Sequence, residues 1–201
     1  MSGEVPLDQS LGEWESLTFK AARGAGYAWG MAEEFAFAAG WLAERGWTDW
    51  RGLVMALRQP HTACAVSRGC AWLDAAHALD ADERHGPVHV CAPILATPFL
   101  DRVASRHVRH VTMQWRGACV QLLGFGNVRW HGAALAATES ELYWRFSSPR
   151  HAAPQVPAGA THTRAHVAAK LHGVLSEFAW RTYVPASDRS RAGAGPQVDD
   201  D

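Results

Sequence analysis

The spacing of apolar residues changes along this chain, and that change restricts the fold more than any other feature. Before residue 80 apolar residues recur three and four positions apart, which predicts helices, whereas after Gly86 they alternate with polar residues, which predicts strands. Because the predicted strands follow the helices as a block, the pattern favours an α+β fold over an alternating α/β fold. We expect a helical N-terminal half, a small antiparallel sheet in the middle and a late amphipathic helix that packs back.

Four helices are predicted in the first 80 residues. The second is the best defined, because Met31, Phe35 and Leu42 share one face and Gly46 stands where a left-handed C-cap forms. Thr48 is the expected N-cap of the third helix, which stops before Pro60. The predicted ranges are 11–22, 29–45, 48–59 and 67–79.

The second half mixes strands and helices. A short extended piece should lead into a helix over about 97–106, and glycines at 117, 124 and 126 mark turns between strands. An alanine- and proline-rich loop separates the last of these strands from the late helix. The predicted strands are 110–117, 118–132 and 141–148, and the late helix is 163–180.

The length of 201 residues predicts one domain. We place it over residues 1–185, with a helical part at about 10–82 and a sheet-containing part at about 86–185. The remaining residues, 186–201, form a glycine-rich acidic segment that we expect to fold back on the N-terminal helices.

Composition and charge narrow the classes of function. Nineteen basic residues against twenty acidic ones give a formal net charge of −1, so the chain lacks the basic field of a nucleic-acid-binding protein. No apolar run reaches the roughly 18 residues of a membrane span, and the acidic N-terminus lacks the features of a secretory signal. We therefore predict a cytoplasmic protein without nucleic-acid or membrane partners.

Two segments at opposite ends of the sequence place arginine beside a Gly-Ala-Gly turn. The first is KAARGAGYAWGMAEE at 20–34, and the second is SRAGAGPQVDDD at 190–201. Such turns bring backbone N–H groups together, and arginine adds a fork of donors, so together they would suit a carboxylate or a phosphate. The alternative is that the first turn is a tight helix connection and the second a frayed terminus. Neither segment has a nucleotide-binding fingerprint.

In these segments the chain resembles a family of uncharacterised proteobacterial proteins of about this length, a domain of unknown function. The residues that carry the resemblance are KAARGAG and WGMAEE near the start, and RTYVPAS, SR, GAG and the terminal aspartates near the end. The resemblance implies no known reaction. The position of these motif residues at opposite ends of the sequence is easiest to understand if the two ends of the chain meet in space.

The histidine and cysteine patterns suggest other kinds of site, a metal site and a Cys-His pair, with less support than the two Gly-Ala-Gly segments. His162 and His166 are four residues apart, with His172 further on, but HTRAH lacks the glutamate of a zinc helix, and we assign no metal. A pairing of His61 with Cys64 lacks a third, orienting group. The cysteines are interpreted as reduced residues of the core; they are Cys64, Cys70, Cys91 and Cys119.

The hypothesis favoured here is a small cytoplasmic enzyme that acts on an anionic, carboxylate-bearing metabolite; no pattern names its cofactor. Tyr183 or a carboxylate from Glu33, Glu34, Asp199 or Asp201 would handle protons. Trp29 would wall the pocket with Tyr27 and Tyr183. The residues predicted to bind the substrate are Lys20, Arg23, Gly24, Gly26, Trp29, Ser187, Ser190, Arg191, Gly193 and Gly195.

The alternative is an accessory or interaction protein without catalytic activity. Its C-terminal segment would dock on a partner subunit or on another copy in a homo-oligomer, with terminal aspartates meeting Lys20 or Arg23. Ten tryptophans and the lack of a recognisable catalytic constellation favour it.

Overall fold

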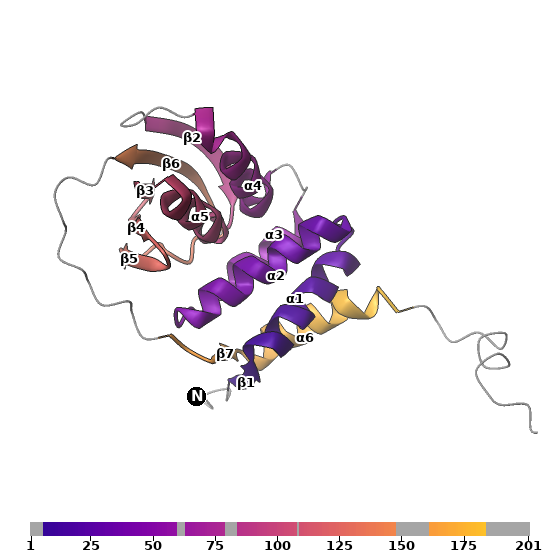
Figure 1. Cartoon of the computed structure of the whole chain (residues 1–201). Helices are drawn as coiled ribbons and strands as arrows, with labels where there is room; N and C mark the ends of the chain where they lie inside the picture. Colours follow the sequence, from indigo (N-terminus) through magenta and orange to yellow (C-terminus); the bar gives the residue numbers. More distant parts are fainter. Residues whose placement is uncertain (1–5, 60–62, 79–83, 108, 148–160, 184–201) are drawn as a thin grey trace, which may run out of the picture.

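The structure is a computed structural model that describes residues 6–59, 63–78, 84–107, 109–147 and 161–183. It confirms the predicted α+β class: helices fill the N-terminal half, an antiparallel sheet follows, and a helix comes last (Figure 1). The helices are α1 (Leu11–Gly24), α2 (Trp29–Glu44), α3 (Arg51–Arg58), α4 (Ala65–Ala75), α5 (Thr97–His107) and α6 (Ala169–Trp180). The strands are β1 (Leu7–Ser10), β2 (Arg84–Cys91), β3 (His110–Trp115), β4 (Ala118–Gly124), β5 (Asn127–His131), β6 (Glu139–Ser147) and β7 (Arg164–Val167).

A capping box starts α1. The Ser10 hydroxyl accepts the Glu13 N–H at 3.3 Å, and Glu13 Oε2 accepts the Ser10 N–H at 2.9 Å. Trp14 is fully buried between α1 and α2, where its Nε1 donates to the Ala39 carbonyl at 3.3 Å. The first two helices therefore form where the periodicity predicts them, and α1 extends two residues beyond the predicted end.

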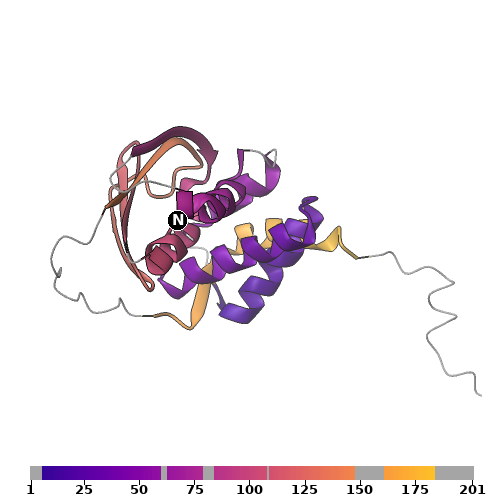
Figure 2. The same cartoon turned by 45° about the horizontal axis from the view of Figure 1, so that its top comes forward.

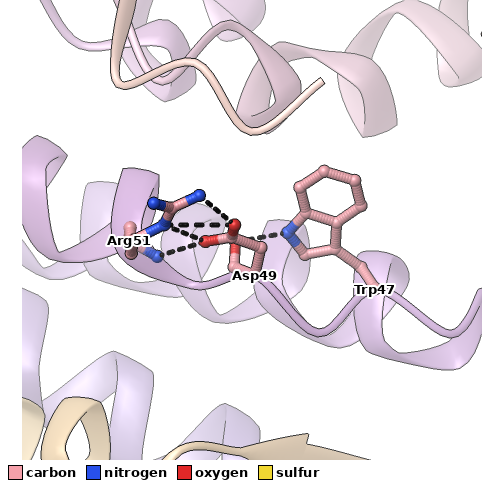
Figure 3. Close-up of polar contacts among 3 residues, drawn as sticks. All are labelled: Trp47, Asp49 and Arg51. Atoms are coloured by element: carbon pink, nitrogen blue, oxygen red, sulfur yellow. Dashed lines mark hydrogen bonds and ion pairs between the residues drawn. The ribbon is translucent and has the colours of Figure 1, made fainter. Parts of the chain in front are cut away.

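The third helix begins three residues later than predicted. Asp49, and not Thr48, holds its first turn, because Asp49 Oδ1 accepts the Arg51 N–H at 3.2 Å and the carboxylate pairs with the Arg51 guanidinium at 2.6 Å. Trp47 Nε1 donates to the Asp49 carbonyl at 2.7 Å and fixes the segment from the other side (Figure 3). The turn before α3 is thus built from an ion pair and an indole.

The five-stranded sheet has the order β2-β6-β3-β4-β5 and curves around α5 (Figures 1 and 2). Its inner face buries alternate residues of the central strands, which is why these strands alternate in sequence. The predicted strand at 118–132 is the hairpin β4–β5, whose turn contains positive-φ glycines at 124 and 126 as expected. The buried inward side chains include Val111, Met113, Val120, Leu122, Trp144 and Phe146.

The hairpin turn is tied to α5. Phe125 lies between the two glycines with φ +53°, its N–H donates to Ser105 Oγ at 2.6 Å, and the Gly126 N–H donates to Asp101 Oδ2 at 3.0 Å. Asp101 is buried, and this burial raises the pKa of its carboxyl, opposed by the hydrogen bond from Gly126 and the charge of Arg45. These hydrogen bonds attach the β4–β5 turn, at the β5 edge of the sheet, to α5.

The late helix starts six residues after its predicted start, because the residues before it form a strand. Leu7 pairs with Val167 and Ser10 with Arg164, so β1 and β7 make a separate two-stranded antiparallel sheet. Ala165 and Val167 are buried whereas Arg164 and His166 are exposed, which is the period of a strand and not of a helix. The N-terminal strand therefore pairs with the strand that leads into α6.

Beyond the β1–β7 sheet, α1 and α6 run side by side in the same direction (Figure 1). The two backbones lie very close at Gly24, where a Cβ atom would collide with the carbonyl oxygen of Phe178. Only glycine permits this contact of two helix backbones. Gly24 is therefore a packing residue that sets how near the end of α6 comes to the end of α1.

We predict that Gly24→Ala lowers the free energy of unfolding by about 1–3 kcal/mol, because the added methyl group has to displace the backbone of α6. Gly12→Ala, in the first turn of the same helix, is the matched control, since nothing lies within 4 Å of its added Cβ. Alanine has the higher helix propensity, so the control should be neutral or stabilising. Urea unfolding measures both, and equal stability of the two variants would contradict the packing role of Gly24.

Candidate functional site

The ends of α1 and α6 enclose a hollow of about 430 Å³, here called the α1–α6 cavity. Its walls come from the last turns of the two helices and from the first residue of α2. The lining residues are Phe19, Lys20, Arg23, Gly24, Gly26, Trp29, Arg181 and Thr182.

Three cationic side chains surround this cavity. Lys20 and Arg23 belong to the last turns of α1, and Arg181 is the C-cap residue of α6, so all three stand where helix dipoles favour positive charge. Within the described ranges, no ion pair joins any of them to a carboxylate. The cavity is consequently a positively charged depression on a protein whose formal net charge is −1.

Two of the cations are partly ordered by contacts within the protein. Arg23 Nη1 donates to the Tyr27 carbonyl at 2.6 Å, and its guanidinium lies 5.8 Å from the centre of the Trp29 ring. The Arg181 guanidinium lies 4.4 Å from the centre of the Phe178 ring. Arg23 keeps its Nη2 and Nε donors beyond the bond to Tyr27, because a guanidinium has five N–H groups.

The backbone of the Gly-Ala-Gly turn is engaged with α1. The N–H groups of Ala25, Gly26 and Tyr27 donate to carbonyls of α1 at 2.9–3.1 Å, and Gly26 has φ +96°. The bonds from Gly26 and Tyr27 form a Schellman motif, which caps the C-terminal end of α1. The amides of this turn are therefore used inside the protein, and charge for a ligand comes from the side chains around it.

A second hollow, of about 470 Å³, adjoins the first along the same two helices. Lys20 lines both, and Trp180 and Tyr183 lie at the rim of the second with their rings 5.1 Å apart. Glu13 lines it as well, and hydrogen bonds from Ser10 lower the pKa of this carboxyl. Lys20 is thus positioned to reach a ligand in either hollow.

The other predicted site residues near α2 face elsewhere. Glu33 accepts the Trp29 Nε1–H at 3.0 Å, and Glu34 pairs with Arg102 of α5 at 3.5 Å; neither carboxylate lines the two hollows. Tyr27, expected to wall the pocket, is instead buried and donates its hydroxyl to the Ala56 carbonyl at 2.9 Å.

The predicted C-terminal half of the site lies outside the described residues. The residues concerned are Ser187, Ser190, Arg191, Gly193, Gly195, Asp199 and Asp201. Of the C-terminal residues that the structure describes, Arg181 and Thr182 line the α1–α6 cavity, and sequence reasoning did not select either of them. A signal was present, because both belong to the segment RTYVPAS that carries the family resemblance.

The histidines do not share a helical face. His166 lies on β7 with its Nδ1 3.7 Å from the Asp8 carboxylate. His162 precedes that strand, and its backbone N–H donates to the Glu44 carbonyl at 2.7 Å. His172 contacts Gln9 at 3.1 Å. In the described part of the chain, no three histidine, cysteine, aspartate or glutamate side chains gather as a metal site would require.

The cysteines divide into buried and accessible thiols. Cys64 and Cys91 are buried and adjacent across an isolated β-bridge, with both thiols free. Burial raises the pKa of the Cys91 thiol to about 12, and burial together with the charge of Glu34 raises that of Cys70 to about 12. The core role predicted for Cys64 and Cys91 agrees with this burial, whereas Cys119 lines a hollow on the outer face of the sheet.

One family model matches part of the chain. Residues 9–84 match the family described as "Protein of unknown function (DUF3726)". The matched range runs from the end of β1 through α4 and contains the turn after α1 and Trp29. The likeness to an uncharacterised family is supported over this range, and the description names no reaction. No curated protein and no solved structure matches the chain. None of the described helices combines the length and the apolar character that a membrane span requires.

We predict that iodoacetamide at pH 8 labels Cys119 in the folded protein before the other cysteines. The reactive form is the thiolate, and a pKa of about 12 leaves Cys70 and Cys91 with about one thiolate in ten thousand at that pH. Mass spectrometry of peptides after short labelling measures the order, with the urea-unfolded chain as the control in which all four react. Labelling of Cys64 or Cys91 as fast as Cys119 would contradict the burial of that pair.

Proposed function

We propose that the α1–α6 cavity binds an anionic, carboxylate-bearing small molecule, and that the protein is a cytoplasmic enzyme acting on such a metabolite. The observation that carries the proposal is the grouping of Lys20, Arg23 and Arg181 around one cavity without a described carboxylate partner. Unpaired cations that share a concave surface lower the free energy of a bound anion more than isolated surface charges do.

The lining would hold a carboxylate through side-chain charges and not through backbone amides. Phosphate sites at helix ends use free backbone N–H groups at an N-terminus, whereas this cavity lies at two C-termini and the turn amides are engaged. Arginine forks match the two oxygens of a carboxylate, and Lys20 supplies a third positive charge. Trp29, 62% exposed, provides an aromatic wall for the remainder of the ligand.

Proton transfer in this proposal falls to Tyr183. Among Tyr183, Glu33 and Glu34, only Tyr183 lines one of the two hollows, and Lys20 lies beside it in the same lining. A carboxylate held by Lys20 and Arg181 would place the reacting part of the molecule toward the second hollow. Tyr183 is therefore the residue to which we assign the acid–base role in this enzyme.

We predict that citrate raises the melting temperature of the full-length protein in a concentration-dependent manner, because a ligand bound only to the folded state stabilises it. Lys20→Gln and Arg181→Gln should each weaken citrate binding about 10-fold or more, the loss expected for a charge-assisted hydrogen bond. Both residues are exposed, so the unliganded melting temperature should change little.

Arg68→Gln on the exposed surface of α4 is the matched control, since it removes one positive charge away from the cavity. This variant should bind citrate like the natural protein. If the double variant of Lys20 and Arg181 binds citrate unchanged, the cavity is not the site.

A second candidate function is favoured by the exposed aromatic rings at the same end of the molecule. Trp29, Trp180 and Tyr183 are 62%, 69% and 55% exposed, and they border the two hollows that Lys20 joins. Exposed aromatics among cations are typical of interface anchors. In this alternative the acidic C-terminal segment of another copy docks here, with Asp199–Asp201 meeting Lys20 and Arg23.

Truncation after Val184 separates the two candidates. If the C-terminal segment docks on a second copy, we expect the full chain to elute as an oligomer and the truncated chain as a monomer on size exclusion with light scattering. Docking of this kind depends on charge, so about 0.5 M salt should weaken the full-length oligomer. A full chain that is monomeric at every concentration would rule out docking between copies.

A further inference from the structure

The outer face of the five-stranded sheet holds two arginines side by side. Arg84 of β2 lies directly opposite Arg145 of β6 in the strand register, and both side chains are exposed. Like charges in directly opposed positions destabilise a sheet. Among the residues that the structure describes, no carboxylate forms an ion pair with either arginine. The arginine pair therefore lowers the stability of the sheet when nothing is bound. An anion shared between the two guanidinium groups would remove this repulsion.

Two adjoining hollows lie on this face. The smaller, about 170 Å³, is lined by polar groups that include Arg84, Arg145, Thr112 and Gln114. The larger, about 510 Å³, shares Arg84 and Gln114 with the first, and no described carboxylate lines either hollow. The larger one continues over small residues and backbone toward β5; these are Gly117, Ala118 and Gly132, flanked by Cys119 and His131.

Arg84 is held in place at the junction of the two hollows. Its guanidinium lies 4.2 Å from the centre of the Tyr143 ring, and Tyr143 lines both hollows. A guanidinium stacked on a ring loses less conformational freedom when it binds an anion, and its N–H fork stays available at the edge. Arg145 approaches from the neighbouring strand, so two forks converge on the smaller hollow.

We propose that this face binds a small organic phosphate monoester, with the phosphate in the smaller hollow between Arg84 and Arg145. A phosphate carries close to two negative charges at neutral pH, which matches two guanidinium groups, and its three free oxygens leave acceptors for Thr112 and Gln114. The organic part of the ligand lies in the larger hollow, whose lining of glycine and alanine leaves room for it. This site shares no residue with the α1–α6 cavity and stands whether or not that cavity binds a carboxylate.

Isothermal titration calorimetry of the full-length protein with phenyl phosphate tests the proposal. We expect saturable binding that is tighter than that of inorganic phosphate, because the ring adds contacts in the larger hollow. Arg145→Gln should weaken phenyl phosphate binding about 10-fold or more through loss of one charged fork. Arg84→Lys should weaken it too, since lysine keeps the charge but loses the fork and the stacked geometry.

Two controls separate this site from general effects of charge and folding. Arg106→Gln, on the exposed end of α5, removes one positive charge away from both hollows of this face and should bind phenyl phosphate like the natural protein. In phosphate-free, low-salt buffer, Arg145→Gln should melt no lower than the natural protein, because it removes a like-charge pair.

Three results would overturn the proposal. One is equal binding of phenyl phosphate by Arg145→Gln and the natural protein, and another is the absence of binding at millimolar concentration. The third is strongly salt-dependent binding of a single-stranded oligonucleotide, lost in Arg145→Gln, without binding of phenyl phosphate. That result would assign the face to a nucleic-acid backbone instead of a small phosphate.

Discussion

The contact between the backbones of α1 and α6 at Gly24 and Phe178 determines how these two helices pack. The β1–β7 sheet joins the same two segments at their other end, so α6 is fixed beside α1 along its length (Figure 1). Because the helices run in the same direction, their C-terminal ends lie together. The carbonyl ends of two helices then face one region, which favours the cations Lys20, Arg23 and Arg181 found there. The positive cavity is a consequence of this parallel arrangement.

Local sequence signals predicted the parts of the fold that depend on neighbours along the chain. The apolar stripes of α1 and α2 are of this kind, and so are the left-handed Gly46 after α2 and the glycines of the β4–β5 turn. The sequence did not reveal β1 and β7, because each is four residues long and its partner lies more than 150 residues away. Val167 fits a helical stripe as well as a strand, and only the pairing with Leu7 separates the two. The segment forms a strand because it pairs with β1, although its local sequence also fits a helix.

The residues of the candidate site also fall into two groups, those that the sequence predicted and those whose position depends on tertiary contacts. Lys20, Arg23 and Trp29 were selected because they surround one turn, and the structure brings them to one cavity. Arg181 was not selected, since its position depends on the contact between α1 and α6. The arginine pair of the sheet was also beyond sequence reasoning, because a register of Arg84 opposite Arg145 exists only once β2 and β6 pair. Arg84 and Arg145 are 61 positions apart, so no local sequence pattern indicates that they pair.

A chain with almost equal numbers of acidic and basic residues has enough carboxylates to pair most of its cations. In the described structure Arg45, Arg51 and Arg102 are paired in this way, while the unpaired cations of the α1–α6 cavity share one concave surface. A small carboxylate and an acidic segment of another copy would both need Lys20 in that cavity. Occupation by one therefore excludes the other, and mass action makes a cavity ligand weaken any docking that uses the same cations. If the proposed ligand and the proposed docking segment both use these charges, a metabolite that fills the cavity would also control whether copies associate.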